Sequence, residues 1–258
     1  MSTRRNGNSV LTCSLDQVSL RTIDQRIVVD GINEEPSDLP LSQTGGLLLR
    51  PERDKLTITI KIRIKEPNLV ENELLKQQVN GWAAAGGWLR TNLHERQKIH
   101  VQCARLLSSA APNFESTREL SFVSSGLAYW QDDSVESVSS VANTSAGSLS
   151  LAPNGTRTSY LEAEITNAGS DTMTSLQLSA NGYTILFQDL SVPAGGTLEI
   201  GYDDLHFMYA IVGSTHVLGK RTGQSADHIY LTPMRSNLIS YTASQPVSVI
   251  FKARGVYE

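Results

Sequence analysis

The chain has 258 residues and a mass of 28.1 kDa, so it has room for two ordinary domains or one large β domain. Hydrophobic residues make up 40% and charged residues 19%, which provides a packed core and excludes a disordered chain. The formal net charge of -4 argues against a general nucleic-acid coating protein, because such a protein needs a basic surface. Two cysteines, Cys13 and Cys103, are too few for a disulfide scaffold, and we expect two unpaired thiols.

No segment approaches the ~20 consecutive apolar residues that cross a bilayer, so we expect no membrane insertion. The first eight residues carry charge without a following apolar stretch, which is unlike a secretory signal. We therefore expect the chain to be made in a cytoplasm and to stay soluble.

The most regular pattern of the sequence lies at residues 56–65 and predicts a long, half-buried antiparallel strand. Its aliphatic side consists of Leu56, Ile58, Ile60, Ile62 and Ile64. Its polar side consists of Thr57, Thr59, Lys61, Arg63 and Lys65. Ten alternating residues exceed the usual strand length of ~5–6, so we expect one arm of a hairpin that projects past its own domain.

We expect the aliphatic side of this strand to be too long for a small domain to cover alone, and therefore to form a ring interface with a neighbouring subunit. In this prediction Lys61, Arg63 and Lys65 meet solvent or acidic groups of an adjacent protein. The stretch from Arg50 to Lys65 holds six basic and two acidic residues, which also permits a nucleic-acid surface or a plain solvated strand face. The nucleic-acid interpretation lacks the aromatic residues on which bases stack.

One helix is predicted directly after the long strand. Asn68 can cap it, and Glu71 follows at the spacing of a capping box. An apolar stripe for the core is assigned to Val70, Leu74, Leu75, Val79 and Trp82. The pair Gly86-Gly87 ends the helix. Further strands of the first domain are expected at 88–91, 98–105, 119–123 and 126–130.

The stretch 134–150 contains seven serines and is interpreted as a linker or an exposed crossing between domains. It places a domain boundary near residue 140, with a first domain at 1–138 and a second at 139–258. Residues 1–138 hold 16 of the 22 basic residues, which supports the division. The second part predicts an antiparallel β-sandwich. Its strands are expected at 159–166, 175–178, 183–188, 197–202, 205–212, 228–231, 238–241 and 247–254.

The search for catalytic chemistry finds no nucleophile elbow, phosphate loop or dinucleotide-binding glycine pattern. His94-Glu95 is not followed by a second histidine, because position 98 is Lys98, so a zinc-protease motif is absent. The adjacent pairs Asp132-Asp133 and Asp203-Asp204 suit turns better than catalysis. We expect no catalytic residue, no cofactor and no metal.

The order of several motifs along the chain is more informative than any single motif. Trp82 in the predicted helix precedes Gly86-Gly87, Ser121-Phe122 precedes Tyr129-Trp130, and the chain closes with Phe251-Lys-Ala-Arg-Gly255. In these motifs, and across almost its whole length, the chain resembles the distal tail proteins of long-tailed, siphovirus-type bacteriophages. It departs from that family at 234–236, where a Gly-containing turn is common.

The resemblance implies a mainly β protein without enzymatic activity that acts as a structural hub of the phage tail tip or baseplate. Its first domain would be a β-barrel or sandwich-like domain with one helix and a long β-hairpin. That domain would form a homo-oligomeric, hexameric ring beneath the tail tube protein, with a channel that DNA crosses only in transit. Its second domain would be a galectin-like or carbohydrate-module-like antiparallel sandwich.

The implied partners are therefore the tail tube protein, a tail tip or hub protein, and receptor-binding or side-fibre proteins. The implied location is the virion, with assembly in the bacterial host cytoplasm.

A second hypothesis is a lectin-like adhesion protein whose sandwich recognises a host cell-surface glycan. A sugar site needs an exposed aromatic ring with polar groups around it. The candidates are Tyr160, Tyr183, Tyr202, Tyr209 and Tyr230. The second domain lacks tryptophan, which weakens this hypothesis. A glycosidase is disfavoured because no separated carboxylate pair stands out.

Overall fold

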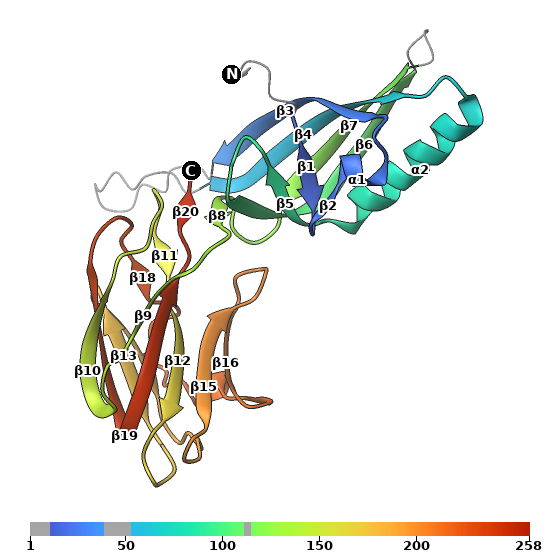
Figure 1. Cartoon of the computed structure of the whole chain (residues 1–258). Helices are drawn as coiled ribbons and strands as arrows, with labels where there is room; N and C mark the ends of the chain where they lie inside the picture. The colour runs from blue at the N-terminus through green and yellow to red at the C-terminus, as the bar shows by residue number, and fades with distance from the viewer. Residues whose placement is uncertain (1–10, 39–52, 111–114) are drawn as a thin grey trace. The chain divides into compact units, whose positions relative to one another are not determined.

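The computed structural model describes residues 11–38, 53–110 and 115–258, and the protein is mainly β, as predicted. The chain divides into two compact units, Met1–Trp130 and Gln131–Glu258. Within the described residues no helix is long and apolar enough to cross a membrane. Figure 1 labels the elements of each unit.

The first unit is built on one antiparallel sheet with the strand order β2-β1-β5-β6-β7-β4-β3. Its strands are β1 (Cys13–Leu15), β2 (Val18–Ser19), β3 (Ile27–Asp38), β4 (Arg53–Lys65), β5 (Gly87–Thr91), β6 (Gln97–Ala110) and β7 (Glu115–Ser124). A short helix, α1 (Leu20–Ile23), leads into β3. An isolated bridge between Leu11 and Val29 joins the two ends of the sheet, so the sheet curls into a barrel-like shape.

The predicted helix is α2 (Leu69–Ala85), and it begins at Asn68, whose side chain accepts the backbone N–H groups of Val70 and Glu71. The second half of the expected capping box is different. Glu66, not Glu71, accepts the backbone N–H of Asn68, at 2.8 Å. Glu71 instead pairs with Arg26, with 2.8 Å between the charged atoms. The helix ends at Gly86, whose φ of 64° favours glycine.

The apolar stripe assigned to α2 is only half right. Leu75, Val79 and Trp82 are buried against the sheet, but Val70 and Leu74 are 71% and 53% exposed. At ~100° per residue, Val70 and Leu74 fall on a different side of the helix from Leu75. Trp82 also contacts Phe122 edge to face, with 6.0 Å between the ring centroids. The helix is therefore anchored to the sheet by the narrow stripe of Leu75, Val79 and Trp82.

The second unit is an antiparallel sandwich, as predicted. Its strands in chain order are β9 (Glu136–Ser139), β10 (Thr144–Leu151), β11 (Ser159–Tyr160), β12 (Glu162–Asn167), β13 (Leu176–Ala180), β14 (Tyr183–Phe187), β15 (Thr197–Tyr202), β16 (Met208–Val212), β17 (Thr215–His216), β18 (Tyr230–Leu231), β19 (Asn237–Ala253) and β20 (Val256–Tyr257). A single 3-10 turn, η1 (Leu218–Lys220), follows β17. β8 (Trp130–Asp132) contains the boundary between the units.

The long strand β19 holds this sandwich together, and Figure 1 shows it running between β10 and β12. Its first half pairs with β10 and β13, and its second half pairs with β12 and β9. Alternate residues point inward along both halves, from Ile239 and Tyr241 to Val249 and Phe251. β19 therefore contributes to both layers of the sandwich, which strands achieve by bending from one sheet into the other.

The serine-rich stretch 134–150 is not a linker. It contains β9 and β10, and both pair with β19. The pairing explains why the unit boundary lies at Trp130/Gln131 and not at the expected residue 138. The expected strand at 126–130 is also wrong, because residues 125–129 form bends and the strand begins only at Trp130.

Candidate functional site

The predicted interface strand is β4, and it lies inside the sheet of its own chain. It pairs with β3 along one edge and with β7 along the other. Its aliphatic side chains are at most 1% exposed in the single chain: Leu56, Ile58, Ile60, Ile62 and Ile64. The expectation that a neighbouring subunit must cover them is therefore wrong, because the curled sheet and α2 bury them within the unit.

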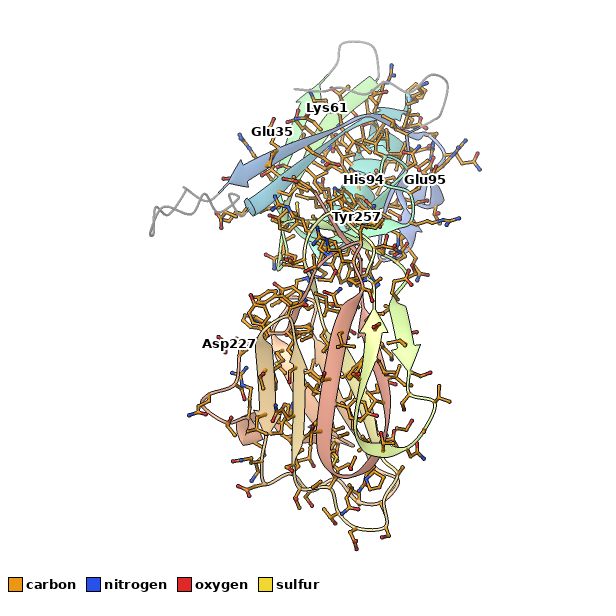
Figure 2. All side chains as sticks on the ribbon, turned by 90° about the vertical axis from the view of Figure 1, so that its left-hand side faces the viewer. Glu35, Lys61, His94, Glu95, Asp227 and Tyr257 are labelled. Atoms are coloured by element: carbon orange, nitrogen blue, oxygen red, sulfur yellow. The ribbon has the colours of Figure 1, made fainter. Side chains whose placement is uncertain are left out.

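The opposite side of β4 is charged and accessible. Lys61 lies 3.8 Å from Glu119 of β7, and Arg63 lies 2.8 Å from Asp30 of β3. Lys65 is exposed at the end of the strand. Figure 2 labels Lys61 on the outside of the first unit. Exposed pairs of this kind contribute only ~0–1 kcal/mol each, so they leave this face open to a charged partner. Arg50, the first residue of the predicted basic patch, lies outside the described residues.

The free edge of the sheet belongs to β3, which the sequence analysis missed. Within the described ranges, no strand pairs with the outer edge of β3 beyond the bridge at Val29. The stretch from Gly31 to Ser37 follows β4 in an uninterrupted register and is mostly exposed. An edge of this length is a template for pairing with another chain.

Pro36 shows which backbone groups of β3 face outward. Proline has no N–H and fits a strand only where that position faces away from the ladder. Ile32 and Glu34 lie four and two residues before Pro36 in the same register, so their N–H groups point outward as well. The edge of β3 therefore presents backbone donors, and Pro36 limits how far along the strand a partner can pair.

Side-chain contacts hold β3 in place from within the unit. Glu34 binds Nε2 of His94 at 2.7 Å and accepts the indole N–H of Trp130 at 3.3 Å. The rings of His94 and Trp130 stack with 4.1 Å between centroids. Figure 2 labels His94 among the side chains of the first unit. The edge is thus a rigid feature and not a loose strand.

A charged network fixes the junction of β3, β4 and α2. Arg26 binds Asp24 at 2.8 Å and also contacts Glu66 and Glu71. The side-chain hydrogen bond from Arg26 holds the pKa of Asp24 below its usual value. The pKa of Glu66 is lowered chiefly by the backbone N–H of Asn68 and further by Arg26.

A second concentration of side chains lies in the second unit, and we call it the aromatic cluster. It consists of Tyr160, Tyr183, Tyr202, His206, His228 and Tyr230. The ring of Tyr160 is its centre, 4.9 Å from the ring of Tyr202 and 5.4 Å from that of Tyr230. His228 lies 5.2 Å from Tyr160 on another side. All of these rings remain half-buried or exposed and lie outside the aliphatic core.

Four of the five tyrosines suggested for a sugar site therefore come together in the aromatic cluster. The fifth, Tyr209, does not join them, because its hydroxyl donates to Glu199 at 2.8 Å. The cluster also contains His206 and His228, which the sequence analysis did not connect with the tyrosines.

The remaining side chains with possible chemistry are acidic residues, histidines and cysteines. The part of the chain that is described contains no group of three or more histidine, cysteine or acidic side chains that could hold a metal ion. Asp203 accepts the backbone N–H groups of Leu205 and Phe207, which is the turn role expected for it. Cys13 and Cys103 are both free thiols, and burial raises the pKa of Cys13 to about 12.

The sequence matches no known protein-family model. No curated protein is detectably similar to it in sequence. Solved structures, however, share its fold over both units, and they are proteins of phage adsorption apparatus.

The SPP1 Dit protein, described as a paradigm of the hub adsorption apparatus in phages that infect Gram-positive bacteria, aligns with a TM-score of 0.66 and 11% identity. The alignment covers 95% of this chain and 99% of that one. A chain of the phage P2 baseplate in its activated conformation with Ca aligns with a TM-score of 0.51 and 10% identity, over 96% and 98% of the two chains. The corresponding structure with Sr gives 0.54 and 8%, over 95% and 98%.

The chain therefore has the fold of phage distal tail proteins, and the family resemblance drawn from its motifs is confirmed at the level of fold.

Proposed function

We propose that this protein is a structural hub of a phage tail tip, without enzymatic activity. The observation that carries the proposal is the match of the whole fold, over both units, to the SPP1 hub protein.

In this role the first unit assembles into a homo-oligomeric ring, hexameric by analogy with the family, that joins the tail tube to the tip. DNA crosses the channel of the ring in transit, and the second unit holds tip or receptor-binding proteins. The free edge of β3 supports the ring, because a closed ring gives every exposed edge a partner in the next subunit. The charged side of β4, with Lys61, Arg63 and Lys65, lies next to this edge and would set the register between subunits.

Light scattering coupled to size exclusion tests the assembly on the full chain, with negative-stain electron microscopy as the second readout. We expect a single species of several subunits that appears as a ring with an open centre. A chain that stays monomeric over a hundredfold range of concentration, and also in the presence of its tail tube protein, would contradict the ring.

A further inference from the structure

We propose that the aromatic cluster of the second unit binds neutral sugar units of a glycan. Tyr160, Tyr202 and Tyr230 would form a platform for the apolar face of a sugar ring. Polar groups at the margin would bind its hydroxyls. The proposal does not depend on the ring, because every residue of the cluster belongs to the second unit.

The position of the cluster argues against a role in the core. The core of the sandwich is formed by aliphatic residues together with Tyr241, Phe187 and Phe251, and it contains none of the rings in the cluster. The rings come from four strands and two loops and meet at one end of the unit. Tyrosine rings of this kind, with an apolar body and a polar tip, are common at binding surfaces.

Two of the buried polar atoms without a hydrogen-bond partner in the described residues belong to the cluster. In the structure, the hydroxyl of Tyr202 and Nδ1 of His228 are buried without a hydrogen-bond partner. A buried polar atom without a partner costs ~1–3 kcal/mol, so proteins seldom keep one without a function. A ligand hydroxyl or an ordered water would form hydrogen bonds with these two atoms after a small movement of the rings.

The charge state of the cluster favours a neutral ligand. Burial raises the pKa of Tyr202 and lowers that of His228, so both rings are uncharged at neutral pH. Arg221 is already paired with Asp227, at 3.0 Å, and it also donates to two backbone carbonyls. This arginine is therefore already occupied and is a poor anchor for an anionic group.

The margin of the cluster supplies hydrogen-bonding groups. Asp227 is largely exposed, and Figure 2 labels it at the side of the second unit. Asn181 donates to the backbone carbonyl of Tyr230 and is itself exposed. Tyr183, which is 39% exposed, meets Tyr230 edge to face, with 5.1 Å between the rings, and forms a side wall next to the platform. A sugar ring requires aromatic faces surrounded by a few polar groups. A protein partner would need a larger apolar area.

Saturation-transfer NMR on the full chain tests the proposal. The probes are the methyl glycosides of glucose, galactose, N-acetylglucosamine, N-acetylgalactosamine and rhamnose. We expect transfer to at least one probe and a weak, measurable Kd. Tyr160→Leu should weaken binding by about tenfold or more, because it removes the central ring. Tyr183→Ala, at the margin, should weaken binding only a few fold.

Tyr209→Phe is the matched control, because it removes a tyrosine hydroxyl of the same unit outside the cluster, and it should leave binding unchanged. Thermal unfolding must show that each variant is folded. If Tyr160→Leu does not fold, Tyr183→Ala becomes the deciding variant. No transfer to any probe would overturn the proposal. A Kd that is unchanged in both cluster variants would overturn it as well, and the cluster would then be a protein contact or a purely structural feature.

Discussion

At the scale of single residues, substitution of Ile60 distinguishes between two roles of β4, as a core strand of its own unit or as an interface strand of the ring. Ile60 is fully buried in the single chain, with Ile32 opposite it on β3 and Leu120 opposite it on β7. Ile60→Asp should therefore unfold the first unit by burying a carboxylate without a partner, at a cost of about 4 kcal/mol or more. The neighbouring Lys61→Ala is the control and should change stability by less than about 1 kcal/mol.

Chemical denaturation followed by circular dichroism measures both variants. A folded Ile60→Asp chain that has lost only its assembly would restore the original interface hypothesis for this side chain.

The Arg26 network predicts a pH dependence of stability. The pKa values of Asp24 and Glu66 are lowered in the folded state. Their stabilisation is therefore fully present above their unfolded pKa values, near ~4, and is lost as the pH falls through the folded values. Arg26→Ala should lower the melting temperature at pH 7 and have little effect near pH 2, where the carboxylates are protonated. An equal effect at both pH values would show that Arg26 acts through packing alone.

At the scale of elements, the edge of β3 makes the sharpest prediction about assembly. Ile32→Pro removes an outward N–H from the edge and places a ring where a partner strand would dock. We expect this variant to shift the chain from ring to monomer in light scattering. Arg21→Ala, at an exposed position of α1 away from this edge, is the control and should assemble normally. Full rings from a folded Ile32→Pro chain would move the interface to another surface, such as the exposed Val70 and Leu74 of α2.

The strands also show which parts of the fold could be predicted from the sequence and which could not. β4 was predictable because its alternation is unbroken over ten residues. β3 was missed because a bulge between Val29 and Gly31 shifts its alternation by one residue, which disguises the pattern. β10 was missed because its exposed side is rich in serine, and only Leu151 among its residues is fully buried. The aromatic cluster was out of reach because its rings come from segments up to 70 residues apart, between Tyr160 and Tyr230.

At the scale of the whole molecule, the two units differ in how their sheets close. The first unit closes its sheet through the bridge between Leu11 and Val29, and the seven strands β1 to β7 along its main path lie between residues 13 and 124. The second unit depends on β19, at Asn237–Ala253, as the partner of β9, β10, β12 and β13. The main strands of the first unit are therefore paired within the first half of the chain, whereas the second unit is completed only by its last long strand.

This dependence on β19 determines the order in which the two units can fold during translation. A ribosome delivers the chain from its N-terminus at ~5–20 residues per second, and domains generally fold as units. The first unit can fold while the second is still being translated. Strands β9, β10, β12 and β13 must wait with an unpaired edge until β19 has left the exit tunnel. A translation pause or a truncation before residue 237 would thus leave a folded first unit attached to an aggregation-prone tail, and only finished chains would supply both halves of the hub.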